Sequence, residues 1–365
     1  MRLLNGDLRP LLRAPLLALS FVGLVVGAGA GLARLNWGVP TPIASASSLH
    51  GPMMVSGFLG AVIALERAVA IGRAWAYLGP LLTGLGTLAA VAGMGSITGW
   101  CFLAGGLILL AASIEVCRRQ TALFTFTLAL GAFYWSVGNA LWVAGMAVHD
   151  MVSWWLAFLI LTIAAERLEL SRLLPPSAVA QRMFAVIIVV IGGGLLGSTW
   201  RWGPQLFAAG VLALSVWLLK QDIARRTVRN RGLTRFIAVC LLSGYVWLAV
   251  GGGIVLAAGA LAPGSPSYDA ALHAIFLGFV FSMIFGHAPI IFPAVLRVKI
   301  PYHPIFYLPL VLLHGSLLVR LAGDAGERYD WTRIGGMFNA AALAAFIVST
   351  ACAAVYGRRD RERAA

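Results

Sequence analysis

Six histidines are the first residues of this 365-residue chain to suggest chemistry. Neutral imidazole is the usual protein ligand of haem iron and binds copper well, and burying it in an apolar environment costs far less than burying a formal charge. The six are His50, His149, His273, His287, His303 and His314. Their places relative to the apolar segments decide which of them are candidate ligands.

His50 and His273 each lie within the first turn or two of a long apolar segment, directly after a leucine. If the two segments run in the same direction and face each other, the two imidazoles lie at one depth. A six-coordinate haem b needs two such axial ligands, because the iron is approached from both sides of the ring. The alternative is that each histidine caps its helix at the membrane interface.

His287 follows His273 by fourteen residues in the same segment. A helix places both on one side, roughly 21 Å apart. A short loop joins this segment to the one that carries His314, so His287 and His314 are predicted to lie at similar depth. Met283 would add a soft ligand for copper. The pattern predicts a second haem or copper site. The alternative is a buried pair hydrogen-bonded to backbone that nearby prolines set free.

His149 and His303 are predicted to lie in loops, as surface residues. His149, with Asp150 beside it, could join a metal site at the outer face of the membrane. Three glutamates, Glu66, Glu115 and Glu166, lie near arginines at predicted helix ends. We expect local ion pairs there; the alternative is a proton entrance, because such a path would begin at carboxylates.

The amino-acid composition indicates that these residues belong to a membrane protein. Hydrophobic residues make up 60% of the chain, charged residues 11%, and the mean hydropathy is +0.90, whereas soluble domains carry about 25% charged residues. The net charge of +14 comes from arginines between apolar runs and not from a basic face, so no nucleic-acid partner is expected. The four cysteines form no CxxC pair, which argues against a disulfide framework, a thiolate zinc site and covalently attached haem.

Twelve apolar segments are long enough to cross a bilayer. They fall at 12–33, 48–71, 75–95, 97–117, 122–147, 151–170, 182–200, 203–219, 235–262, 269–296, 304–323 and 333–356. The first is expected to be an uncleaved span and not a signal peptide. The linkers are short, so residues 1–365 form one membrane domain. Gly251 to Gly253 predict close helix packing, or the close approach of a flat ligand.

Positive residues predict the orientation of these segments. Counted from a cytoplasmic N-terminus, the inner linkers hold most of the basic residues, such as Arg118 with Arg119 and the run from Lys220 to Arg235. The outer linkers hold only single arginines until the mixed segment from Arg320 to Arg333. Both ends are therefore predicted to be cytoplasmic.

An internal repeat relates the second and sixth segments. At an offset of 100 residues, six residues recur within ten positions, beginning with Phe58 and Phe158 and ending with Arg67 and Arg167. The tenth segment opens on Leu272-His273, as the second opens on Leu49-His50. We expect three related four-helix units at about 1–117, 118–219 and 220–365.

Twelve spans in three such units, with histidines opening the second and tenth, resemble the catalytic subunit of the haem-copper oxidases and nitric oxide reductases. The resemblance implies that His50 and His273 hold a low-spin haem. The chain departs from that superfamily because the seventh and eighth segments contain no histidine, and positions 271 and 275 are Ala and Ile. An oxygen-reducing binuclear centre of that design is not expected.

The chain is more similar to the NnrS family, twelve-span haem- and copper-containing proteins linked to nitric oxide stress. The shared features are Leu49-His50-Gly51-Pro52-Met53-Met54 with Gly57-Phe58, and Leu272-His273-Ala274 leading through Gly278 and Met283 to Gly286-His287. The continuation Ala288-Pro289 departs from the family pattern.

We therefore expect an all-α, haem-copper-oxidase-like protein of a bacterial inner membrane that binds haem b, with a second haem or copper site. Its role would be nitric oxide or redox chemistry, as an oxidoreductase or a sensor, with a membrane or periplasmic electron donor and a small gaseous or redox ligand. The alternative is a secondary transporter of a small solute or metal, because twelve spans with repeats also describe many carriers.

Overall fold

The computed structural model describes residues 6–171, 176–259 and 262–364, with side chains as far as residue 357. Within these residues the chain consists of helices joined by short loops and contains no strand. Lipid offers no hydrogen-bond partners, so a spanning segment must satisfy its backbone groups internally, as a helix does. The predicted all-α class is confirmed.

Twelve helices of the described chain are long and apolar enough to cross a membrane. No end differs by more than four residues from the expected segments. The helices span Pro10–Arg34, Ser47–Ile71, Ala74–Val91, Gly95–Arg119, Leu123–Val143, Val148–Leu170, Ala178–Leu196, Gly203–Gln221, Gly232–Ala258, Pro266–Leu296, Pro304–Ala325 and Tyr329–Gly357.

The chain divides into two compact units, and the division falls inside two helices. Unit 1 comprises Met1–Phe158 and Ile291–Arg297, and unit 2 comprises Leu159–Ile290 and Val298–Ala365. The predicted arrangement of three four-helix units stays a prediction.

Unit 1 is built around α1, which packs on η3 and α5, while α6 packs between α5 and α7. Its elements are α1 (Pro10–Arg34), α2 (Thr41–Ala44), η2 (Ser47–Leu49), α3 (His50–Pro52), η3 (Met53–Gly60), α4 (Ala61–Ile71), η4 (Ala74–Tyr77), α5 (Leu78–Val91), α6 (Gly95–Arg119), α7 (Leu123–Val143) and the first half of α8 (Val148–Leu170).

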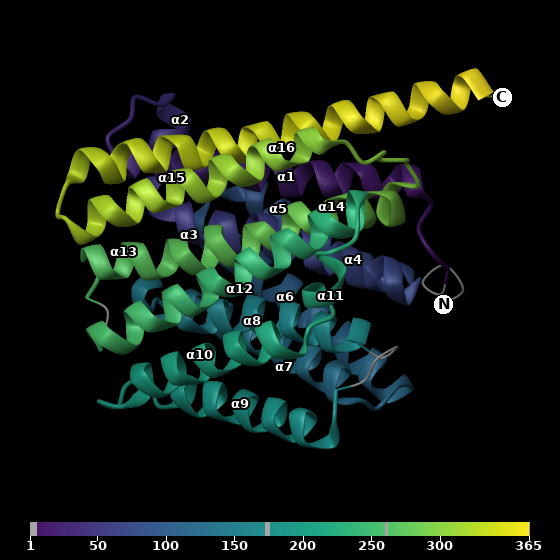
Figure 1. Ribbon diagram of the computed structural model, residues 1–365. Helices are drawn as coiled ribbons and strands as arrows, with labels where there is room; N and C mark the ends of the chain where they lie inside the picture. Colours follow the sequence, from purple (N-terminus) through teal and green to yellow (C-terminus); the bar gives the residue numbers. More distant parts are fainter. Residues whose placement is uncertain (1–5, 172–175, 260–261, 365) are drawn as a thin grey trace. The chain divides into compact units, whose positions relative to one another are not determined.

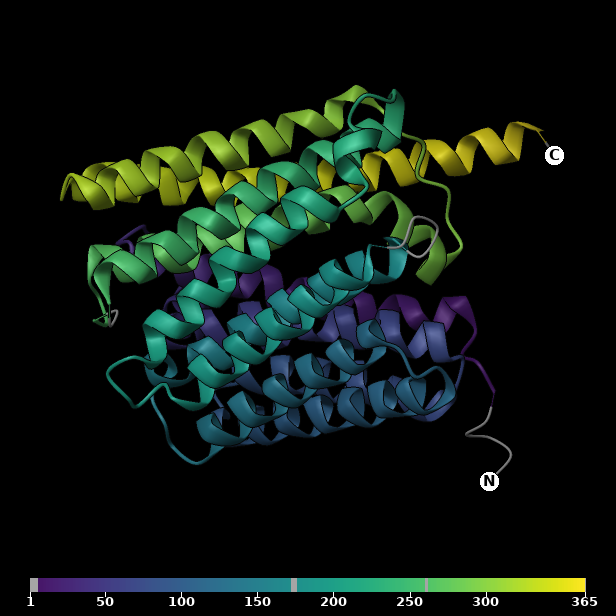
Figure 2. The ribbon, with the colours of Figure 1, turned by 60° about the horizontal axis from the view of Figure 1, so that its bottom comes forward.

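In unit 2, α10 packs on α9 and α12, and α12 packs on α13 and η6. The yellow-green hairpin of α15 and α16 lies side by side in both views (Figure 1 and Figure 2). The elements are the rest of α8, α9 (Ala178–Leu196), α10 (Gly203–Gln221), α11 (Ala224–Thr227), α12 (Gly232–Ala258), α13 (Pro266–His273), η6 (Ala274–Phe281), α14 (Ser282–Leu296) as far as Ile290, η7 (Pro304–Phe306), α15 (Tyr307–Ala325) and α16 (Tyr329–Ala364).

Two spanning helices contain a π-helical segment of eight residues, η3 and η6. Such segments are rare and are found frequently at functional sites. η3 begins three residues after His50, and η6 begins directly after His273. The repeat-related sixth span, α8, is α-helical along its length. The π-helices therefore lie in the same two spans as His50 and His273.

A tryptophan packs on a glycine of each π-helix. A Cβ on Gly60 would lie 2.2 Å from Cζ2 of Trp135, and a Cβ on Gly278 would lie 2.4 Å from Cγ of Trp247. The close packing expected at the glycines of α12 is confirmed at Gly251, where a Cβ would meet the side chain of the η6 residue Ile275 at 2.4 Å. These glycines admit bulky neighbours because they lack a side chain.

Candidate functional site

His50 is the first residue of α3, and its ring lies against α1 of the same unit. Its Nδ1 lies 2.7 Å from the carbonyl oxygen of Gly27. A carbonyl only accepts, so Nδ1 carries the proton and the lone pair of the neutral ring is on Nε2. Gly31, one turn further along α1, makes room for the ring, because a Cβ there would lie 2.8 Å from Cε1 of His50.

His273 is the last residue of α13, in unit 2, and its Nδ1 has the same role. It lies 2.8 Å from the carbonyl oxygen of Asp269, one turn earlier, and 3.2 Å from Oδ1 of that residue. The Asp269 carboxylate is held in turn by Arg320 of α15, through Nε at 2.7 Å and Nη2 at 2.8 Å. The ring is thus oriented by both a carbonyl and a fixed carboxylate.

Both rings bond through Nδ1 in the way that metal-ligating histidines do, with one nitrogen donating to an oxygen and the other holding the lone pair. A histidine that caps a helix must instead accept from a backbone N–H. The Nδ1 bonds of His50 and His273 have the opposite polarity, so they do not support the capping alternative. The joint ligation of one haem by these two residues stays a prediction.

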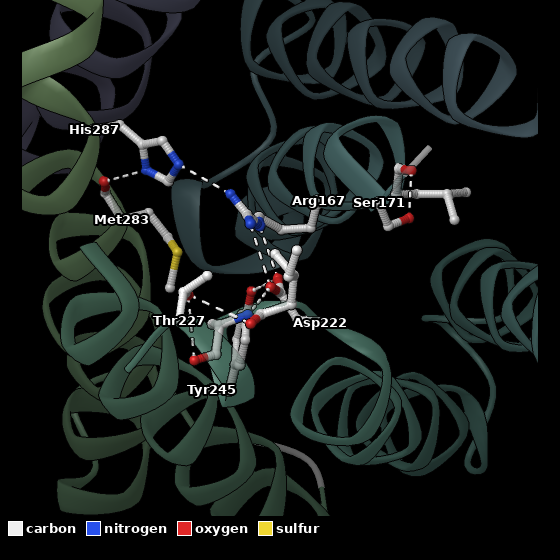
Figure 3. Close-up of polar contacts among 10 residues, drawn as sticks. Arg167, Ser171, Asp222, Thr227, Tyr245, Met283 and His287 are labelled. Atoms are coloured by element: carbon white, nitrogen blue, oxygen red, sulfur yellow. Dashed lines mark hydrogen bonds and ion pairs between the residues drawn. The ribbon is translucent and has the colours of Figure 1, made fainter. Parts of the chain in front are cut away.

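His287 lies in a polar network that the sequence did not indicate. Its Nδ1 is 2.7 Å from the carbonyl oxygen of Met283, so this nitrogen donates, and its Nε2 accepts from Nη1 of Arg167 at 3.2 Å. Figure 3 shows the guanidinium of Arg167 between His287 and Asp222. A metal on Nε2 would have to replace the bond from Arg167.

Asp222 follows α10 and accepts four hydrogen bonds. Arg167 donates from Nε at 2.7 Å and Nη2 at 3.2 Å, the hydroxyl of Tyr245 at 2.5 Å, and the backbone N–H of Ala224 at 2.8 Å. The side chains of Arg167 and Asp222 are 6% and 1% exposed. Burial of this ion pair is tolerated because the carboxylate is fully satisfied.

His314 forms a different set of bonds. Its Nδ1 accepts from Nε1 of Trp247 at 2.9 Å, so its Nε2 donates to the hydroxyl of Ser243 at 3.1 Å. In the described chain no residue takes part in the bonds of both His287 and His314, and no three His, Cys, Asp or Glu side chains form a group that could hold a metal ion. The predicted site of His287, His314 and Met283 stays a prediction.

The remaining expectations have mixed outcomes. The prediction of a loop position is confirmed for His303, which precedes η7, and is wrong for His149, which is the second residue of α8. α8 begins at Val148, three residues before the expected start of this span at residue 151, because the polar residues His149 and Asp150 are part of its first turn. Nε2 of His149 lies 3.5 Å from Oδ1 of Asp150.

Glu115 forms the expected local ion pair, with Arg119 at 2.9 Å.

Arg167, the arginine that follows Glu166, is buried and hydrogen-bonds to Asp222, which is 55 residues away in the sequence and was not expected as a partner. Arg320 and Asp324 are likewise buried within spanning segments, each 7% exposed. Sequence reasoning missed these residues because charges near helix ends usually reach the interface. One signal was present: Asp222 is the only acidic residue in the basic run from Lys220 to Arg235.

A search of the curated proteins finds no match to the chain. A family model described as a domain of unknown function, DUF8744, matches residues 13–355, which include all twelve candidate spans nearly in full. The chain belongs to the DUF8744 family.

Proposed function

We propose that this chain is a haem b-binding protein of a bacterial inner membrane, with His50 and His273 as axial ligands and both termini in the cytoplasm. The observation that carries the proposal is the shared geometry of the two histidines. Each donates its Nδ1–H to a backbone carbonyl, at 2.7 Å and 2.8 Å. This bond fixes the tautomer whose Nε2 can bind iron.

The surroundings of both residues fit a haem ligand. Neutral imidazole is the donor that haem b takes, and the carboxylate of Asp269 beside His273 would raise the basicity of the ring. A π-helix follows each histidine directly or within three residues. The extra residue in a π-turn displaces neighbouring side chains from their α-helical positions, a device common near bound groups.

A haem held by two histidines would supply one-electron chemistry. The resemblance to the NnrS family favours nitric oxide or redox chemistry, as an oxidoreductase or a sensor served by a membrane or periplasmic electron donor. A second haem or copper bound by His287, His314 and Met283, or an outer metal at His149, is the finer part of this proposal. The side chain of His149 is 42% exposed and could reach such an ion.

The test is the absorption spectrum of the full chain, expressed with an adequate haem supply and purified in detergent. We expect a Soret band, a pyridine haemochrome of haem b and about one haem per chain. Copper analysis of the same sample tests the second site. A preparation that is folded but has no Soret band and no bound metal would overturn the proposal.

Transport is the second candidate, and the buried pair of Arg167 and Asp222 favours it, because intramembrane charges often mark the path of a solute or proton. A carrier without a cofactor would lack visible absorbance. Uptake of candidate solutes into proteoliposomes would then depend on Asp222, with Asp222→Asn abolishing uptake and the exposed Asp150→Asn leaving it unchanged.

A further inference from the structure

Unit 2 contains an open cavity of about 670 Å³ at the ends of three candidate spanning helices. α8 ends beside it, α9 begins at it, and α10 ends at it; the lining includes Ser171, Ser177 and Gln221. In the proposed orientation this is the cytoplasmic side. The volume lies within the range of small-molecule sites.

The lining is strongly basic. Lys220, Arg225, Arg226 and Arg229 contribute positive charges, and Asp222 is the one acidic residue among the described lining residues. The carboxylate of Asp222 is already neutralised by Arg167, so it does not offset those four charges. The cavity therefore carries a positive charge that none of its described lining side chains balances, and like charges held together repel.

The helix dipoles do not determine the sign of the charge at the cavity. The positive end of α9 is there, because Ser177 is its N-cap, but the negative end of α10 is there as well. The basic side chains therefore determine the positive charge at the cavity.

The segment that carries the cations is held in place. Asp222 accepts the N–H of Ala224 at 2.8 Å at the start of α11, and Nη1 of Arg225 donates to the carbonyl of Lys220 at 3.0 Å. Arg226 and Arg229 extend from this anchored turn and line the cavity with exposed side chains. Arginine presents a planar fork of donors that matches the oxygens of phosphate.

We propose that this cavity binds the phosphate group of an anionic ligand, through Lys220, Arg225, Arg226 and Arg229. At the membrane boundary, phosphate is offered by two sources, an anionic phospholipid headgroup and a soluble phosphorylated molecule. The proposal is independent of haem binding.

The test uses the full chain in phosphatidylcholine nanodiscs and two probes. Inorganic pyrophosphate, measured by titration calorimetry, represents the soluble source. Phosphatidylglycerol retained by the protein, measured by native mass spectrometry, represents the headgroup. The variant is R226A/R229A, and the matched control is R118A/R231A, which also removes two exposed arginines but none that lines the cavity.

We expect R226A/R229A to weaken binding at least about tenfold, since charge-assisted bonds are lost, while R118A/R231A binds as the wild type does. Loss for phosphatidylglycerol alone identifies a lipid headgroup, and loss for pyrophosphate alone identifies a soluble ligand. Binding of neither probe by the wild type, or equal losses in the two variants, would overturn the proposal. If the double variant does not fold, R226A and R229A are measured singly against R118A and read by the same criteria.

Discussion

The guanidinium of Arg167 in α8 holds the carboxylate of Asp222, with Nε 2.7 Å from Oδ2. Both side chains are almost completely buried, and Tyr245 and His287 complete the surroundings of the pair. The pair ties the second half of α8 to the turn after α10 within unit 2. A buried pair of this kind is tolerated only while both partners are present.

Removing the carboxylate alone should therefore be costly. Asp222→Ala leaves a buried guanidinium without its counter-charge, and we expect the free energy of unfolding to fall by about 3–5 kcal/mol. The measurement is unfolding by sodium dodecyl sulfate in mixed micelles, followed by circular dichroism.

The control for this change is Glu115→Ala, which removes a carboxylate paired with Arg119 at a partly exposed helix end. Its expected cost is about 0–1 kcal/mol. The double variant R167M/D222L should recover most of the stability lost in D222A, because it removes both charges. Equal costs for Asp222→Ala and Glu115→Ala would show that the pair contributes no more than a surface contact.

The two π-helices predict a paired effect at their glycines. Gly60→Ala and Gly278→Ala each place a methyl group against a tryptophan, Trp135 or Trp247, and should destabilise by about 1–3 kcal/mol. Gly315→Ala in α15 meets nothing within 4 Å and should be neutral or stabilise by up to about 1 kcal/mol. Thermal unfolding of the three variants in one detergent decides this, and a gain in stability at Gly60 or Gly278 would contradict it.

Asp269 should tune the reduction potential of a haem held by His273. Its carboxylate lies 3.2 Å from Nδ1 of the ring. Asp269→Asn removes a negative charge beside the iron ligand, and this favours the reduced iron. A potentiometric titration should show a higher midpoint potential, with Asp150→Asn unchanged. A lowered or unaltered potential in D269N would refute this role.

The membrane-spanning architecture could be predicted because apolar length and charge position depend on local sequence. The ends of the spans agree to within four residues. The placement of His50 and His273 near the start of their spans followed from the same pattern. His149 was placed in a loop because His149 and Asp150 are polar and separate two apolar runs, although both belong to the first turn of α8.

The polar network and the π-helices could not be predicted in this way. The pairing of Arg167 with Asp222 spans 55 residues and depends on how α8 packs near α10. Arg67, its counterpart in the repeat, has the same neighbour in sequence but is only half-buried. The shift to π-helix at η3 and η6 depends on packing against neighbouring helices, and no residue type in Met53–Gly60 or Ala274–Phe281 marks it.

The most direct test of haem ligation compares absorption spectra and haem content of His50→Ala and His273→Ala with His303→Ala, an exposed histidine before η7. We predict that each of the first two variants loses the low-spin spectrum or the haem itself, while His303→Ala keeps the spectrum and the haem content of the wild type. A low-spin bis-histidine spectrum that persists unchanged in either His50→Ala or His273→Ala would contradict the assignment of that ligand.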